Sequence, residues 1–331
     1  MFPLFRHLLP IDEREAEFSR RGFSCARPEV RERLEHAGVI FLRGYHAAMK
    51  ISSDEALTAD LEKFEPGYRG FSYEGAAMAM ALQDGMVPRS KRLKRFMIES
   101  GKQHRYMLHV GAGWAAARLP WLRYRIESYI QNFDPVLRWL VVDGYGFHEG
   151  YFHFRRTLKT LPHHLSATAR SVYYQGFGRS LWFVCGADFE RIANTVDQLP
   201  HLYHADAWSG IGLACAYAGG ASAAEIRRAA NRCARFVPAM AQGAAFAAKA
   251  RELAGNPAEH TNAACVVLCG MSAETAAALC GENLQKVEMS SLPSPYQQWR
   301  MLLQHSFPAT PIPRGDTHEI LFPQVASAKF H

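Results

Sequence analysis

The feature that most constrains this chain is a short glycine-led segment, rich in small residues, that recurs along most of its length. The copies are RGYHAAM, EGAAMAMAL, VGAGWAAARL, DGYGFHEGYF, QGFGRSLWF, SGIGLACAY and QGAAFAAKA. Their lead glycines are Gly44, Gly75, Gly111, Gly144, Gly176, Gly210 and Gly243, which are separated by 31, 36, 33, 32, 34 and 33 residues. A period near 33 residues is typical of the helix-turn-helix units of α-solenoids.

The copies are too rich in Ala, Leu, Met and aromatic residues for loops, so each predicts a buried inner helix with closely approaching backbones. Amphipathic stretches at 87–100, 121–133, 188–199 and 222–236 predict outer helices between them. We therefore expect an all-α fold of tandem helical hairpins, an α/α solenoid with a period of about 33 residues.

Two units are expected along the chain. Residues 1–285 form the helical repeat array, with an N-terminal cap and a capping hairpin at its end. Residues 286–331 form a C-terminal helix, at 296–307, and an extended tail from Pro308 onward.

Composition favours a soluble, cytoplasmic protein. The hydrophobic share of 48% is ample for a core, while no apolar run reaches the roughly 18 residues that span a bilayer. The opening MFPLFRHLLPIDERE does not read as a secretory segment. The seven cysteines are an odd number in apolar stretches, which favours reduced, buried thiols over disulfides.

Part of the formal charge of +7 is concentrated in one short segment that contains Arg89, Lys91, Arg92, Lys94, Arg95, Lys102 and Arg105. This segment is either a solvated helix face or a surface for phosphate groups or for an acidic partner, such as a carrier protein or another enzyme. It lacks interleaved aromatic residues and any nucleic-acid motif, so we expect no nucleic-acid partner.

The position before each lead glycine forms a row that is mostly polar. Its members are Arg43, Glu74, Val110, Asp143, Gln175, Ser209 and Gln242. Because buried polar groups need partners, the row predicts either a ladder of hydrogen bonds between successive repeats or the polar lining of a groove.

The units led by Gly144 and Gly176 carry the strongest candidates for acid/base chemistry. Their candidate catalytic residues are Asp143, His148, Glu149 and Arg179. Arg179 is alternatively a structural partner that neutralises one of these carboxylates. Candidate ligand-binding residues are Glu74, Trp114, Gln175, Trp182, Trp208 and Gln242.

Motifs for metals and cofactors fail on spacing. In His148-Glu149-Gly150-Tyr151-Phe152-His153, a five-residue helical step turns the second imidazole roughly 140° from the first, unlike the zincin HExxH. The pair Cys265 and Cys269 lacks a fourth ligand. No dinucleotide fingerprint or phosphate loop follows a strand, so we predict neither metal nor cofactor.

The blocks GFSYEGAAMAMALQD, DGYGFHEGYF, QGFGRSLWFVCGAD, WSGIGLACAYAGG and AQGAAFAAKAR resemble a bacterial family known as domain of unknown function 1702. That family includes proteins encoded in enediyne polyketide gene clusters, and the resemblance covers about Phe5 to Gln285. It implies a place in secondary-metabolite biosynthesis rather than a reaction. The residues it carries over as candidates are Glu74, Asp143, His148, Glu149, Gln175, Arg179, Trp208 and Gln242.

Three functions remain open. The first is an accessory protein that binds a hydrophobic polyketide or polyene-like molecule in a groove lined by Met78, Met80, Trp114, Phe147, Trp182, Tyr217 and Phe246. The second is an acid/base enzyme that cyclises or rearranges that molecule. The third is a scaffold that holds a biosynthetic partner through the basic segment.

Overall fold

A computed structural model describes residues 11–87, 89–289 and 293–307, and within these ranges the chain is helical with no strand. The all-α prediction is confirmed. The longer helices are α3 (Pro28–Lys50), α5 (Pro66–Met86), α7 (Arg105–Arg118), α10 (Trp139–Lys159), α11 (Ala167–Val184), α13 (His204–Ala218), α15 (Val237–Leu253), α17 (Ala273–Gln285) and α18 (Pro295–Ser306).

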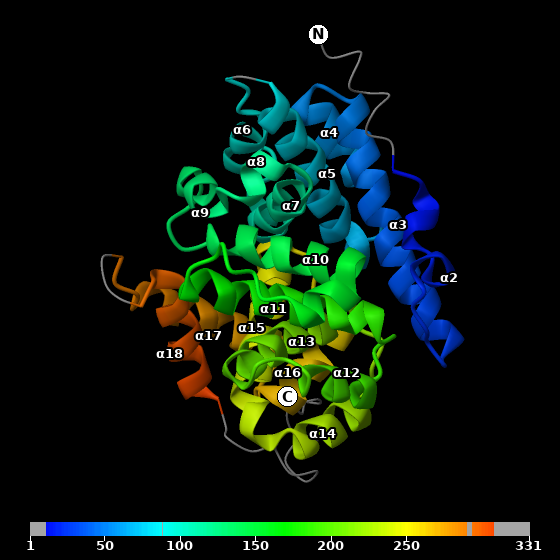
Figure 1. Cartoon of the computed structure of the whole chain (residues 1–331), viewed down its shortest axis with the longest axis vertical. Helices are drawn as coiled ribbons and strands as arrows, with labels where there is room; N and C mark the ends of the chain where they lie inside the picture. Colours follow the sequence, from blue (N-terminus) through cyan, green and yellow to red (C-terminus); the bar gives the residue numbers. More distant parts are fainter. Residues whose placement is uncertain (1–10, 88, 290–292, 308–331) are drawn as a thin grey trace, which may run out of the picture.

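Shorter elements connect these helices. They are η1 (Glu13–Ala16), α2 (Phe18–Arg21), α4 (Asp54–Leu61), α6 (Arg92–Ile98), η2 (Lys102–His104), α8 (Pro120–Arg123), α9 (Ile126–Tyr129), η3 (Ile130–Asn132), α12 (Phe189–Val196), η4 (His201–Tyr203), α14 (Ala223–Arg232), η5 (Ala234–Phe236) and α16 (Glu259–Leu268). Of the long helices, α3, α5, α7, α10, α11, α13, α15 and α17 each pack on the next in chain order (Figure 1).

The lead glycines lie where backbones of neighbouring helices touch. A Cβ on Gly176 would lie 1.8 Å from the carbonyl oxygen of Asp143, and one on Gly144 would lie 2.0 Å from that of Val110. In α11 a second glycine faces the opposite neighbour, because a Cβ on Gly178 would lie 2.1 Å from the Ala207 oxygen. No side chain fits at these distances, which explains why the sequence repeats glycine there.

The outer segments are less regular than the sequence predicts. The helix expected at 121–133 is wrong, because the chain there divides into α8, α9 and η3. Ile126 and Ile130 are buried, and Tyr129 and Phe133 also pack against the core, so tertiary packing fixes this broken path of the chain. In the described part of segment 87–100, the helix is the short α6.

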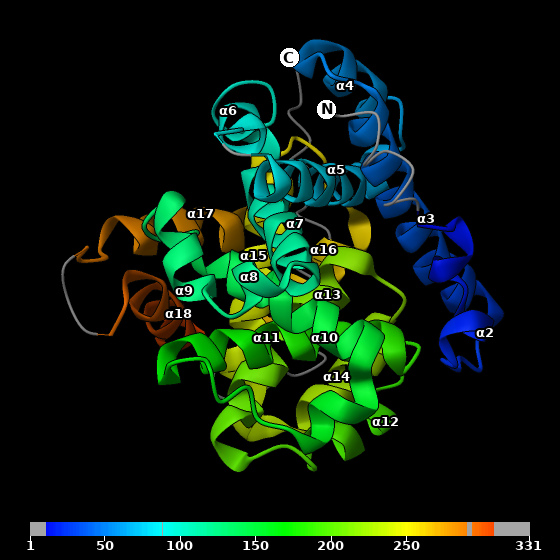
Figure 2. The ribbon, with the colours of Figure 1, turned by 45° about the horizontal axis from the view of Figure 1, so that its top comes forward.

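Helix α18 packs on α15 and α17, on the side of the molecule opposite α3 (Figures 1 and 2). Its side chains Tyr296, Trp299 and Leu303 are fully buried, so this helix forms part of the core. The extended tail predicted from Pro308 lies outside the described residues.

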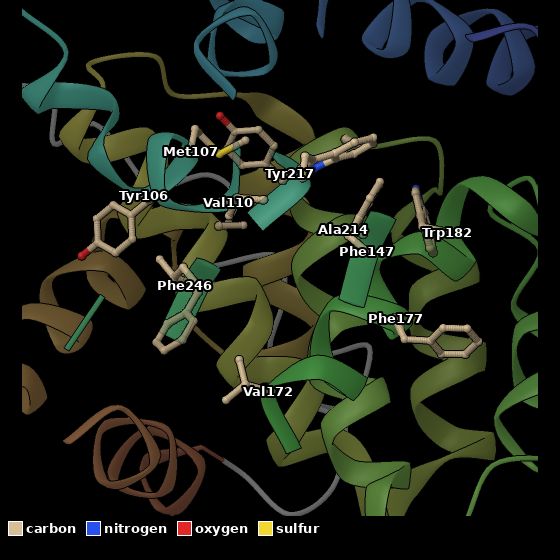
Figure 3. Close-up of a cluster of buried hydrophobic side chains, with 14 of the residues drawn as sticks. Tyr106, Met107, Val110, Phe147, Val172, Phe177, Trp182, Ala214, Tyr217 and Phe246 are labelled. Carbon is tan, nitrogen blue, oxygen red and sulfur yellow. The ribbon is translucent and has the colours of Figure 1, made fainter. Parts of the chain in front are cut away.

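The core runs through the long helices, and Figure 3 shows part of it, with Phe147 of α10, Phe177 and Trp182 of α11, Tyr217 of α13 and Phe246 of α15. All seven cysteines are free, and most of them are buried. Among the described residues, no single helix has the length and apolar character needed to cross a membrane.

Candidate functional site

The long helices enclose a cavity of about 630 Å³, which is bounded by η1, α3, α5, α7, α10, α11 and α13. One side of the cavity is closed where the start of α5 contacts α13. The rings of Phe71 and Tyr217 lie 5.3 Å apart, edge to face, and Arg251 of α15 donates to the carbonyl oxygens of Gly67, at 3.1 Å, and Tyr217, at 2.6 Å. A cavity of this volume matches typical small-molecule sites.

The cavity has an apolar wall and a polar mouth. Apolar lining side chains include Phe41, Met78, Trp114, Phe147, Tyr217 and Phe183. Asp12, Arg20 and His153 also line it and are exposed, so they mark its opening to solvent. Two charged side chains, Glu74 and Arg179, lie in the lining and are almost fully buried.

Glu74 is held inside the cavity by one strong hydrogen bond. Its side chain is on α5, and Trp114 of α7 donates its Nε1 hydrogen to Oε1 at 2.9 Å. Burial raises the pKa of Glu74 from 4.5 to about 7, against the opposing effects of Arg179 and of the Trp114 hydrogen bond. A carboxyl group with this pKa exchanges a proton readily near neutral pH.

Arg179 lies beside the apolar wall with part of its guanidinium group unpaired. Its Nε is 2.8 Å from Oδ1 of Asp143, and its Cζ lies 4.9 Å from the centre of the Phe147 ring. The buried Nη2 has no hydrogen-bond acceptor among the described residues. An unpaired guanidinium nitrogen is costly to bury, so it is suited to an oxygen atom of a ligand.

Asp143 lies behind Arg179 and is completely buried. Burial raises its pKa above the ordinary value, against the lowering effects of Arg179 and of Gln175, whose Nε2 donates to Oδ2 at 2.7 Å. Asp143 therefore positions Arg179 and does not itself line the cavity. This agrees with the alternative in which Arg179 neutralises a buried carboxylate.

Four members of the polar row form hydrogen bonds between neighbouring long helices. Gln175 joins Asp143, and the Ser209 hydroxyl donates to Oε1 of Gln242 at 2.8 Å. The structure adds two partners from α18 that the repeat could not indicate: the Tyr296 hydroxyl, 2.8 Å from Gln175 Nε2, and Arg300. Arg300 also pairs with Asp206 at 2.8 Å.

Four of the predicted site residues meet at the cavity, namely Glu74, Trp114, His148 and Arg179. The other predicted residues are not part of the lining, and these are Asp143, Glu149, Gln175, Trp182, Trp208 and Gln242. Trp182 donates to the Gly219 carbonyl oxygen at 2.9 Å, and Trp208 stacks on Phe236. Both tryptophans are core residues.

The expected separation of His148 and His153 is wrong, because α10 is not a regular helix. At His153 the backbone has φ of −129° and ψ of 30°, which bends the helix. The two imidazole centres are 6.0 Å apart, and His148, Glu149 and His153 offer ligand atoms that all lie within 4.8 Å of one another. A five-residue spacing predicts diverging rings only where the helix is unbroken.

Burial and charge act differently on these three side chains. Burial lowers the pKa of His148 and of His153. Burial alone would raise the pKa of Glu149, but the hydrogen bond to His148 and the nearby charges of His153 and Arg156 lower it overall. Arg156 contacts Glu149 at 2.7 Å, so this carboxylate is ionised and oriented.

The basic segment is partly used inside the protein. Arg92 donates to the carbonyl oxygen of Ala48 at 2.7 Å, and Arg95 pairs with Asp54 at 2.8 Å. These contacts attach α6 to α3 and α4. Binding of a partner by the other, exposed basic residues of this segment stays a prediction.

The chain was compared with protein families, with curated proteins and with solved structures. A family described as protein of unknown function (DUF1702) matches residues 2–307. The comparison with curated proteins and the comparison with solved structures each find nothing that matches.

Proposed function

The chain belongs to the DUF1702 family, whose description names no function, and we propose that its cavity binds an apolar small molecule that bears an oxygen acceptor. The observation that carries this proposal is that Arg179 belongs to the cavity lining and that its buried Nη2 has no hydrogen-bond partner among the described residues. A carboxylate or carbonyl oxygen of the ligand would accept a hydrogen bond from Nη2, and the apolar chain of the ligand would replace water along the aromatic wall.

Glu74 favours a chemical role in addition to binding. With a pKa of about 7 it is present in both protonation states at neutral pH, which suits proton transfer to a bound ligand. Arg179 would then stabilise negative charge that develops on the ligand oxygen. In this acid/base alternative Glu74 transfers the proton, and Asp143 positions Arg179.

The biological setting is part of the proposal. The resemblance of the repeated blocks to proteins of enediyne gene clusters supports a hydrophobic polyketide or polyene as the ligand. The same resemblance supports an accessory role in secondary-metabolite biosynthesis, and the free cysteines support a cytoplasmic location. A single repeat array with a period of about 33 residues is the architecture that we propose for the cavity walls.

The test is a fluorescence titration with a conjugated tetraene fatty acid and with the corresponding alcohol. Loss of a charge-assisted hydrogen bond costs about 1.5–3 kcal/mol, which corresponds to roughly 10- to 150-fold in affinity. Arg179→Lys keeps a cation beside Asp143 but removes Nη2, so it should weaken binding of the acid by that factor. The same substitution should weaken binding of the alcohol less.

Two further variants make the titration decisive. Leu213→Trp fills the cavity from a half-buried position in its lining and should abolish binding of both probes. Arg95→Lys repeats the same substitution on α6, away from the cavity, and should leave both affinities unchanged. Equal affinities for wild type and Leu213→Trp would exclude the cavity as the binding site.

A further inference from the structure

The bend in α10 places two imidazoles and one carboxylate together at the mouth of the cavity. His148 and His153 both line the cavity, whereas Glu149 approaches from behind the lining. The Thr157 hydroxyl lies 3.1 Å from the carbonyl oxygens of both Glu149 and His153, which stabilises the bend. The bend that brings the three side chains together is therefore part of the local fold.

The geometry points to a binding site for one divalent transition-metal ion, with His148, Glu149 and His153 as the protein ligands. Three protein ligands leave coordination positions open. Because both imidazoles line the cavity, these open positions face the space in which we place the small molecule. The inference does not depend on the proposed function, since the ion would bind whether or not a small molecule occupies the cavity.

The distances suit such an ion. Two ligand atoms at about 2.1 Å from a tetrahedral ion lie about 3.4 Å apart. His148 Nδ1 and Glu149 Oε1 are 3.3 Å apart, so this edge of the site has the required length. All the ligand atoms lie within 4.8 Å of one another, so a shift of roughly 1.4 Å or less brings the remaining pairs to that value. His153, which is exposed, has the freedom to make this movement.

The neighbouring residues fit the role as well. Arg156 holds Oε2 of Glu149 at 2.7 Å and leaves Oε1 directed toward His148. An arginine in this place orients the carboxylate in the way that outer partners orient metal ligands. The ring of Trp114 meets that of His148 edge to face at 5.7 Å and restricts its rotation.

The ligand set defines the class of ion. Two imidazoles and one carboxylate suit Zn²⁺, Fe²⁺ or Co²⁺, whereas Mg²⁺ and Ca²⁺ prefer oxygen ligands alone. Metal-free protein should therefore bind one Co²⁺ with a visible absorption band of a four- or five-coordinate ion. Zn²⁺ should displace it in competition, and Mg²⁺ should not. Anaerobic titration with Fe²⁺ then compares the affinity for Fe²⁺ with that for Zn²⁺.

The decisive variant is His153→Ala, because this exposed side chain can be removed without opening the core. Loss of a residue that hydrogen-bonds to a metal ligand costs about 10- to 100-fold in metal affinity. Loss of a metal ligand itself should therefore cost at least about 100-fold. Arg156→Met should show the smaller effect. His201→Ala is the matched control, because it removes one member of a His pair with ring centres 4.9 Å apart.

The result expected is one ion per chain in wild type and in His201→Ala, with binding strongly weakened in His153→Ala and in Glu149→Gln. The circular dichroism spectrum of His153→Ala should match that of wild type. Absence of a cobalt band in wild type would overturn the inference. A band that His153→Ala and Glu149→Gln leave unchanged would overturn it as well.

Discussion

Replacement of Glu74 by glutamine should remove a specific pH dependence of stability. Glu74 is 3% exposed and its pKa rises from 4.5 to about 7 on folding. The folded state therefore binds the Glu74 proton more tightly than the unfolded state does. This contribution to stability is complete below pH 4.5 and is lost as the pH rises through 7.

The magnitude follows from the size of the shift. One pKa unit corresponds to about 1.4 kcal/mol, so the rise lowers the free energy of unfolding by about 3 kcal/mol between pH 4.5 and pH 7.5. Glu74→Gln retains an oxygen that accepts the Trp114 hydrogen bond, and it leaves the facing charges, Arg179 and Asp143, in place. The variant should therefore gain about 3 kcal/mol relative to wild type over this interval.

The assay is urea unfolding of both proteins at closely spaced pH values, with the difference in unfolding free energy as the readout. Buried histidines such as His104 and His109, whose pKa burial lowers to about 4, destabilise the fold as the pH falls. Both proteins contain them, so their contribution cancels in the difference. A difference that stays constant from pH 4.5 to 7.5 would refute the assignment of Glu74 as a buried carboxyl with a raised pKa.

Two further predictions concern the packing of the helices. Gly176→Ala should destabilise the protein by about 1–3 kcal/mol or more, because the new Cβ would lie 1.8 Å from a backbone oxygen and only helix displacement relieves the overlap. Its control, Gly67→Ala in α5, meets no atom within 4 Å and should stabilise by up to about 1 kcal/mol, so equal unfolding midpoints would refute the close-contact account. Trp299→Ala should cost about 3–5 kcal/mol in thermal or urea unfolding, because α18 inserts this side chain fully into the core, and a loss below about 1 kcal/mol would contradict that docking.

The repeated glycines made the long helices predictable, because close backbone contact leaves room for no other residue. The same contacts explain why Gly176 and Gly144, aligned by sequence, meet equivalent carbonyl oxygens. The hydrogen bond between Asp143 and Gln175 was predictable for the same reason. These residues directly precede Gly144 and Gly176, so they lie at the contact between the two helices and bond across it.

The rest of the site depends on long-range geometry. Tyr296 and Arg300 belong to a helix outside the repeat, so spacing gave no indication that they reach Gln175 and Gln242. The bend at His153 was invisible to a helical-wheel argument, which assumes unbroken dihedral angles. Nor does spacing show which face of an inner helix lines a cavity, and so Trp114 could not be distinguished from the core residue Trp182.

The central claim is that an apolar molecule occupies the cavity with an oxygen atom on Arg179. A crystal structure of the protein with the tetraene fatty acid tests it most directly. The account predicts the polyene chain along Phe147 and Trp114, with its carboxylate within hydrogen-bond distance of Nη2 of Arg179. A polyene bound on the outer surface, or one in the cavity with its carboxylate turned away from Arg179, would contradict the claim.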